Sequence, residues 1–227
     1  MGRATAIKAA GSGANLILLA RNAQRLEETA AAAREAATGA SVEQIVCDAS
    51  DARSLAEAAT THADALKNVD VLVNSVGMNI VERAFGKLTD ESWAAMLDAN
   101  LTAAFNLTKA IIPSMRERGR GLIIHIASTA ARKADLSGAA YQATKAGVVA
   151  LNHAVMEEEW GNGIRLTTIM PGMTDTPLLD RRPTPVAPEA RATALQPEDI
   201  ADACLFVMQL PPRAHIAEIV MQPSKRS

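Results

Sequence analysis

The sequence predicts a single three-layer α/β domain, in which helices cover both faces of a doubly wound parallel sheet. Short apolar runs, beginning with residues 15–20, alternate with longer segments of helical character, the order expected for right-handed βαβ units. Residues 15–20 are a continuous apolar run, as expected for a strand buried on both faces. The 227 residues suit one well-buried core, and no linker or internal repeat divides them.

The same pattern places each element. Strands are expected at residues 15–20, 42–47, 69–73, 121–127, 164–170 and 216–221. Helices are expected at residues 23–38, 51–66, 89–118, 138–160 and 197–209. Residues 180–189 hold three prolines and are irregular. They form either a disordered excursion or, as we expect in this fold class, part of a substrate lid over residues 175–196.

Composition narrows the classes of partner. The formal charge of −2 is spread along the chain, without the basic block that nucleic acid would require. The apolar runs are too short to span a bilayer, and the first ten residues lack a signal-peptide pattern. Cys47 and Cys204 lie in apolar surroundings and match no metal-ligand spacing. We therefore expect a cytoplasmic protein of single domain 1–227 that binds neither metal, membrane nor nucleic acid.

Ligands of open parallel sheets bind at the carboxyl ends of the strands, so the residues there are candidate contacts. Arg21 follows the first apolar run, where an acidic residue would bind a ribose hydroxyl. An arginine instead suits a 2′-phosphate, which favours NADP over NAD, unless Arg21 is merely solvated. Asp48 follows the second run and would accept from an adenine amino group. The alternative is a helix-capping role for Asp48 or Asp51.

Three further strand ends hold polar or glycine residues. The third strand ends in Asn74-Ser75-Val76-Gly77, a turn in which glycine lets the backbone approach a ligand. Later strands end in Ser128 and in Pro171-Gly172-Met173-Thr174-Asp175-Thr176, whose hydroxyls would hold a nicotinamide carboxamide. Each feature alone is explained by turn chemistry. Their occurrence at successive strand ends predicts a nucleotide site.

Tyr141 is the only tyrosine in the chain, four residues before Lys145 and thirteen after Ser128. Helix positions i and i+4 share a face, so the ammonium of Lys145 would lie near the phenol. It would lower the phenol pKa from its usual value of about 10 toward the working pH. A serine hydroxyl would hold a carbonyl or alcohol oxygen beside that phenol. These three residues therefore predict a hydride transfer coupled to proton transfer, without a metal.

These motifs, with Asn100 between the turn and Ser128, occur in the order and spacing of the classical short-chain dehydrogenases/reductases. The chain resembles that family over essentially its whole length. The resemblance implies a Rossmann-type seven-stranded sheet, a nicotinamide cofactor and a catalytic tetrad of Asn100, Ser128, Tyr141 and Lys145. Tyr141 would be the general acid/base and Ser128 would orient the substrate. Lys145 would bind the nicotinamide ribose, and Asn100 would hold a relay water.

The resemblance also implies wider contacts. Cofactor contacts are expected from Gly2, Arg21, Asp48, Asn74, Ser75, Val76, Gly77, Tyr141, Lys145, Pro171, Gly172, Met173, Thr174 and Thr176. Substrate contacts are expected from Ser128, Thr129, Leu136 and Met173. The C-terminal region resembles NADP-dependent members that act on small hydroxy acids, serine or related alcohols. Arg181 and Arg182 would grip a carboxylate or, as we prefer, belong to a solvated loop.

Two helices, residues 89–118 and 138–160, resemble those that form the family's dimer and tetramer contacts. A homodimer or homotetramer is therefore expected. The interface residues would be Met96, Leu97, Leu101, Phe105, Val148 and Leu151. Core packing would explain the same apolar stripe equally well.

The chain departs from the family pattern at three places. Asn74-Ser75-Val76-Gly77 replaces Asn-Asn-Ala-Gly and keeps the first asparagine and the glycine. His125 stands within an apolar strand, where the family often has asparagine, and we expect a hydrogen-bonded core histidine rather than a catalytic one. The third departure is that Met1-Gly2 matches only the end of the family's Thr-Gly-x-x-x-Gly-Ile-Gly loop, which is followed by a helix.

The first strand, normally central in the sheet, and two loop glycines are therefore expected to be missing. The two strands on either side of this missing strand would lose their hydrogen-bonding partners in the sheet. We hypothesise that Met1 is an internal methionine of a longer protein. The alternative is a chain that begins here and binds cofactor weakly.

The resulting hypothesis is an NADP(H)-dependent oxidoreductase that interconverts a secondary alcohol and a ketone. The first alternative is a non-catalytic dinucleotide-binding or scaffolding protein that has lost the phosphate-binding loop. The second is a chain that serves only as an oligomer subunit.

Overall fold

The structure is a computed structural model that describes residues 1–37 and 39–225. Thr38, Arg226 and Ser227, which belong to the predicted domain, lie outside the described residues. The strands are β1 (Leu16–Ala20), β2 (Val42–Val46), β3 (Val71–Asn74), β4 (Gly121–Ile126), β5 (Ile164–Pro171) and β6 (Glu218–Met221). The main helices are α1 (Gly2–Gly11), α2 (Ala23–Ala36), α3 (Ala52–Thr61), α4 (Ala63–Leu66), α5 (Asp90–Leu97), α6 (Ala103–Arg118), α7 (Ala139–Glu159), α8 (Pro188–Ala192) and α9 (Pro197–Met208).

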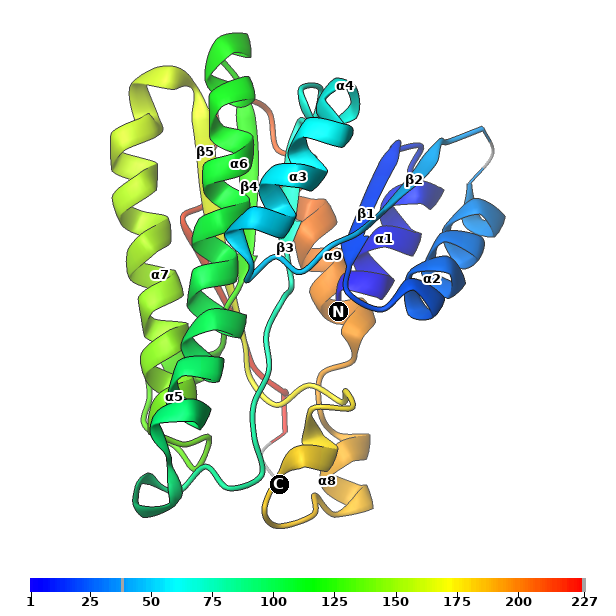
Figure 1. The fold of residues 1–227 in the computed structure, drawn as a ribbon. Helices are drawn as coiled ribbons and strands as arrows, with labels where there is room; N and C mark the ends of the chain where they lie inside the picture. Colours follow the sequence, from blue (N-terminus) through cyan, green and yellow to red (C-terminus); the bar gives the residue numbers. More distant parts are fainter. Residues whose placement is uncertain (38, 226–227) are drawn as a thin grey trace.

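Helices cover both faces of the strands, as the sequence predicts. Figure 1 shows α3, α6 and α7 on one side and α1, α2 and α9 on the other. Each face has its own core. Ile124 and Ile126 of β4 pack against Ile200 and Cys204 of α9, whereas Ile123 packs on the side of α6 and α7. β4 is buried along almost its whole length, which explains why its sequence is almost continuously apolar, whereas the half-buried β2 also carries Glu43 and Gln44.

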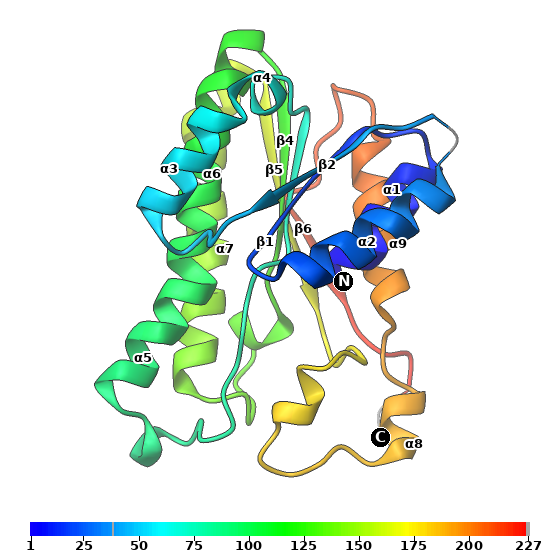
Figure 2. The ribbon, with the colours of Figure 1, turned by 45° about the vertical axis from the view of Figure 1, so that its right-hand side comes forward.

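The parallel strands form two sheets rather than one. Among the described residues, β1 pairs only with β2, and the other sheet has the order β3-β4-β5-β6. All four strand pairings are parallel. The chain begins with α1, and no described strand lies between β1 and β3 (Figure 2). The expected loss of ladder partners on either side of the missing central strand is confirmed.

Two predicted helices are interrupted. The helix expected at residues 89–118 consists of α5, a π turn over Asp98–Thr102, and α6. The helix expected at residues 51–66 breaks at His62 into α3 and α4. Neither break contains a proline or glycine, so the sequence carries no local signal for it.

The predicted lid segment, residues 175–196, is ordered at its base. It contains a short 3₁₀ turn, η5 (Leu179–Arg181), followed by α8. Its ends meet because the amide of Asp175 donates to the carbonyl of Leu195 at 2.7 Å, and Thr174 pairs with Leu195 in a parallel bridge. Arg191 then forms ion pairs with Asp175 and Asp180 inside the loop. These contacts tie the two ends of the segment together, and its role as a substrate lid stays a prediction.

In the part of the chain that the structure describes, no helix combines the length and the apolar character that crossing a membrane demands. The same residues contain no cluster of three His, Cys, Asp or Glu side chains arranged to hold a metal ion.

Candidate active site

Helix α7 places Tyr141 and Lys145 one turn apart. Gly138 caps the helix with φ of +91°, a backbone conformation that favours glycine. Tyr141 is half-buried and Lys145 is buried. The Nζ of Lys145 donates to the carbonyl of Ile126 at 3.1 Å, which ties the helix to the end of β4. The expected shared face is therefore present, and it points to the carboxyl end of the sheet.

Asn100 reaches the same place from the π turn. A π turn widens the helix by one residue, and such turns are frequent at functional sites. The Oδ1 of Asn100 accepts from the amide of Met78 at 2.7 Å, and its Nδ2 donates to the Met78 carbonyl and to the hydroxyl of Thr144, each at 3.1 Å. Asn100 is thus buried and held by the turn after β3 and by α7.

Gly77 shows how closely these groups converge. A Cβ at this position would lie 3.0 Å from both Asn100 Oδ1 and Lys145 Nζ. A carbonyl oxygen and an ammonium therefore flank the same glycine, in a space that a side chain would fill. The predicted proton relay through Asn100 and Lys145 requires this proximity.

Ser128 lies just beyond β4, near the phenol of Tyr141. It is the N-cap of the short 3₁₀ turn η3 (Thr129–Ala131), and its Oγ accepts from the amide of Ala130 at 3.2 Å. The Ser128 hydroxyl lowers the pKa of Tyr141, as expected for a donor beside a phenolate. The structure therefore brings all four members of the predicted tetrad to one end of the sheet.

The pKa of Tyr141 differs from expectation. Burial raises it, and this effect exceeds the opposing effects of Ser128, Arg83 and Arg182. Burial also lowers the pKa of Lys145 to about 8. Lys145 Nζ lies 5.9 Å from the centroid of the Tyr141 ring and donates to a carbonyl instead. The expected lowering of the Tyr141 pKa by Lys145 is therefore not seen in this structure, because the desolvation of the phenol dominates.

The predicted phosphate-binding end is built around the start of α1. The helix begins at Gly2 without a side-chain cap, and its first turn contains no acidic residue. A Cβ on Gly2 would lie 2.3 Å from Ser75 Oγ, so the turn after β3 packs directly against this helix end. Helix N-termini with free amides favour anions. Gly2 and Ser75, predicted separately, thus lie together.

Arg21 and Asp48 lie side by side at the ends of β1 and β2. They form an exposed ion pair, with 3.3 Å between Arg21 Nη1 and Asp48 Oδ2. Asp48 also accepts from the amide and hydroxyl of Ser50, at 2.9 and 2.6 Å. The cap of α3 is Asp51, whose side chain accepts from the amide of Arg53 at 3.0 Å. Of the two capping alternatives, only that for Asp51 is correct.

The loop after β5 is fixed by backbone bonds. The amide of Gly172 donates to the Met221 carbonyl at 2.7 Å, and Thr174 Oγ1 donates to the Gly172 carbonyl at 3.1 Å. Thr176 Oγ1 lies 3.5 Å from the Thr174 carbonyl. The hydroxyls of Thr174 and Thr176 are therefore engaged within their own loop.

Asn74 and His125 face the core instead. His125 is fully buried, with Nδ1 3.1 Å from Asn74 Nδ2 and Nε2 3.1 Å from Thr108 Oγ1. Thr108 donates its own proton to the Ala104 carbonyl, and Asn74 Oδ1 accepts from the amide of Val76. The proton of His125 therefore lies on Nε2. Burial lowers its pKa to about 4, so the ring is neutral near pH 7. The prediction of a hydrogen-bonded core histidine is confirmed.

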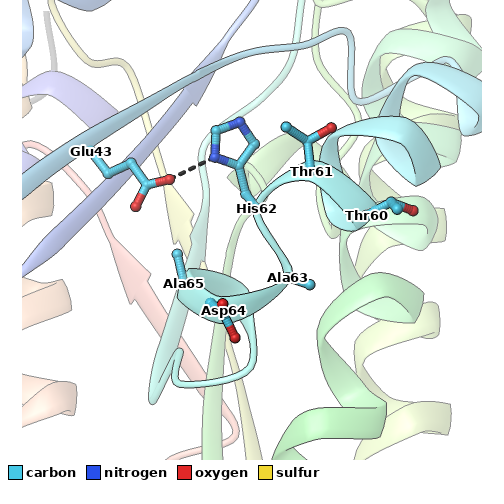
Figure 3. A pocket seen from close by; sticks show the side chains of 7 residues that line it. All are labelled: Glu43, Thr60, Thr61, His62, Ala63, Asp64 and Ala65. Carbon is cyan, nitrogen blue, oxygen red and sulfur yellow. Dashed lines mark hydrogen bonds and ion pairs between the residues drawn. The ribbon is translucent and has the colours of Figure 1, made fainter.

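The predicted substrate contacts are less concentrated. Thr129 and Met173 line a cavity of about 260 Å³ that also includes Asp135 and Gly172. Leu136 is 95% exposed. A second cavity, of about 280 Å³, lies around His62, whose Nδ1 is 2.6 Å from Glu43 Oε1 (Figure 3). Its lining includes none of the predicted site residues, so its chemistry is unrelated to the tetrad.

Sequence reasoning missed two residues. Thr144 links Asn100 to α7 and donates to the Tyr141 carbonyl at 2.9 Å. Its position three residues after Tyr141 on a helix was a usable signal. Arg83 lies in the loop after β3, and its charge lowers the pKa of Tyr141. A single arginine in an irregular loop gave no pattern.

Known proteins are similar to this chain in sequence and in architecture. An uncharacterized oxidoreductase of Staphylococcus epidermidis is 29% identical over 226 residues, which cover 98% of this chain and 92% of that protein. The alcohol dehydrogenase of the archaeon Thermococcus sibiricus, solved with 5-hydroxy-NADP, superposes with a TM-score of 0.87 at 27% identity, covering 100% of this chain and 93% of the other. The closed form of a serine dehydrogenase complexed with NADP+ gives a TM-score of 0.87 at 28% identity, covering 100% and 92%.

The family model for short chain dehydrogenase matches residues 1–186, which include the tetrad and the turn at Gly77. The α/β architecture with parallel strands is that of the Rossmann-type neighbours. The chain belongs to the short-chain dehydrogenase/reductase family, and it is an oxidoreductase of that type.

Proposed function

We propose that this oxidoreductase uses NADP(H) to interconvert a secondary alcohol and a ketone, with Tyr141 as the general acid/base. The observation that supports this most directly is the convergence at Gly77. Lys145 Nζ and Asn100 Oδ1 both lie beside Gly77. Lys145 is one helical turn from Tyr141, whose pKa is lowered by the Ser128 hydroxyl. This arrangement holds a proton donor, a donor for the substrate oxygen and a route for proton exchange in one place.

Each residue has one task in the reductive direction. Ser128 holds the carbonyl oxygen of the substrate, and Tyr141 donates its proton to that oxygen. A proton would then return to Tyr141 through Lys145 and a water held by Asn100. A nicotinamide dinucleotide, when bound, would supply the hydride. Positioning and acid catalysis by Tyr141 account for most of the rate.

The residues present fit such a cofactor. Lys145, whose Nζ lies beside Gly77, would bind the nicotinamide ribose. The start of α1, with Arg3 in its first turn and no acidic residue, suits a diphosphate. At the other end, a 2′-phosphate would replace Asp48 as the partner of Arg21, and an exposed ion pair is weak enough to be exchanged. The two NADP-bound neighbours support the preference for NADP.

We also propose that the protein is a cytoplasmic homodimer or homotetramer. Met96 and Val148 are buried within the chain and belong to its core rather than to an interface. Phe105, on α6, is 47% exposed and remains available for contact. Sedimentation velocity of the wild type and of Phe105→Ser tests this assembly.

Calorimetric titration with NADPH and NADH tests the cofactor. We expect saturable binding that prefers NADPH and a loss of that preference in Arg21→Gln. Folded protein that binds neither cofactor would instead support the non-catalytic alternative.

Tyr141→Phe removes the proposed acid while keeping the ring. We expect turnover to fall by about 100-fold or more, with cofactor affinity changed less than about threefold. The assay combines steady-state kinetics with the cofactor titration. Turnover equal to that of the wild type would remove Tyr141 from the proposed role.

A further inference from the structure

Arg83 is a buried cation beside the proposed catalytic residues. Only 7% of its surface is exposed. It packs against the start of α7, where a Cβ on Gly138 would lie 2.6 Å from the Arg83 carbonyl. Asn79, from the same loop, donates to the Ser137 carbonyl at 3.0 Å. These contacts fix Arg83 against Gly138, which precedes Tyr141 by three residues at the start of α7.

The hydrogen bonds of Arg83 leave its charge uncompensated. Its Nε donates to the Ile80 carbonyl at 2.8 Å, and its Nη2 donates to the carbonyl of Arg181 in the lid. A guanidinium carries five N–H donors and fits carboxylate or phosphate oxygens in a fork. Within the described residues, Arg83 has no ion pair with a carboxylate. Buried charges are normally paired, so this one calls for an anion.

The surroundings of Arg83 are also positive. Arg182 lies near enough to lower the pKa of Arg83 further, after burial itself. The charges of Arg83 and Arg182 both lower the pKa of Tyr141, which places them around the same phenol. Asp135 is the one acidic group that influences both Arg83 and Tyr141, and it is exposed and caps the amide of Ser137.

Two acidic residues of the lid are already paired. Arg191 forms ion pairs with Asp175 and Asp180, so these carboxylates do not neutralise Arg83 or Arg182. The loop after β3 and the lid lie at the same end of the molecule (Figure 2). Arg83 and Arg182 therefore place uncompensated positive charge between Tyr141 and the lid.

We propose that the substrate of this enzyme is an anion, whose carboxylate or phosphate group is bound by Arg83 and assisted by Arg182. This proposal rests on the proposed function, because the bound anion presents its hydroxyl or carbonyl group to Tyr141. Arg83 is then a specificity-determining residue, and its bond to the Arg181 carbonyl closes the lid over the charged end of the substrate.

The test compares matched charged and neutral substrates. The probes are 2-, 3- and 4-hydroxy acids of short chain length, their methyl esters, and glycerol 3-phosphate. For the wild type we expect kcat/KM to favour at least one acid over its ester by about 100-fold. In Arg83→Gln this ratio should fall toward one because kcat/KM for the acid falls more than kcat/KM for the ester, and Arg83→Lys should restore part of the ratio. A preference for glycerol 3-phosphate would identify the anion as phosphate.

Arg120→Gln is the control, since it removes an exposed arginine that is paired with Asp70 outside the lid. It should leave the ratio of acid to ester unchanged. A purely structural role of Arg83 would lower both rates equally and would overturn the proposal, as would equal kcat/KM for acids and esters throughout the series.

Calorimetric titration of the same acids and of glycerol 3-phosphate into protein without added cofactor separates the two levels of inference. If no compound is turned over, the proposed function fails, whereas binding of an anion that Arg83→Gln abolishes still supports the anion site. Absence of anion binding together with equal rates refutes the site alone.

Discussion

Replacing His125 by asparagine should flatten the dependence of stability on pH. The wild-type ring is buried, neutral and titrates at about 4, against 6.5 in an exposed histidine. Below pH 6.5 the unfolded chain therefore takes up a proton that the folded chain refuses. The contribution of the neutral His125 ring to the free energy of unfolding is complete above pH 6.5 and is lost as the pH falls toward 4. Over these 2.5 units, at about 1.4 kcal/mol per unit, the loss is about 3 kcal/mol.

The assay is urea unfolding of wild type and His125→Asn at several pH values between 4 and 7. Asparagine keeps a donor and an acceptor for Asn74 and Thr108, which limits the cost of the substitution at pH 7. Carboxylates contribute equally to both proteins, so the difference between them isolates the ring. Equal pH slopes for wild type and His125→Asn would refute the assignment of a buried neutral histidine.

Two further substitutions test the surroundings of the site. Lys145→Met should raise the free energy of unfolding at pH 7 by about 1–2 kcal/mol while abolishing turnover. Burial lowers the Lys145 pKa from 10.5 to about 8, so the substitution removes a charge that costs about 3 kcal/mol at neutral pH. The loss of one hydrogen bond, to the Ile126 carbonyl, offsets part of this gain. Urea unfolding checks this, and destabilisation would contradict it. Gly138→Ala should cost about 2–4 kcal/mol, because its φ of +91° disfavours a side chain and the new Cβ would meet the Arg83 carbonyl. Thermal unfolding measures the loss, for which Gly161→Ala, with open space around it, is the control.

The sheet and its strand ends could be predicted because burial on both faces leaves a direct trace in sequence. β1, β3 and β4 are short runs that are mostly apolar, and each ends in a turn whose residue types differ from those of a helix. His125 could be assigned to the core for the same reason. The absence of the first strand was also predictable, since only Met1-Gly2 matches the expected loop.

The remaining features depend on tertiary contacts that have no local pattern. The π turn at residues 98–102 follows an unbroken helical sequence, and the bonds of Asn100 to Met78 and Thr144 show what holds it. The raised pKa of Tyr141 follows from the desolvation of its phenol, which the spacing between Tyr141 and Lys145 in the sequence cannot reveal. The position of Arg83 could not be predicted because it depends on a hydrogen bond to the Arg181 carbonyl, which lies 98 residues later in the lid.

The division of the strands into two sheets affects how cooperatively the protein unfolds. No ladder joins β1 to β3, so the part formed by β1 and β2 is held to the rest through apolar packing, with Ile17 and Ile45 against Leu107, and through the contact of Glu43 with His62. A unit held by so few directional bonds opens on its own at a lower free energy than the four-stranded part. Both tryptophans, Trp93 and Trp160, lie outside that unit. Fluorescence therefore follows the part that contains His125 and the active site, whereas circular dichroism follows both parts and gives the broader transition.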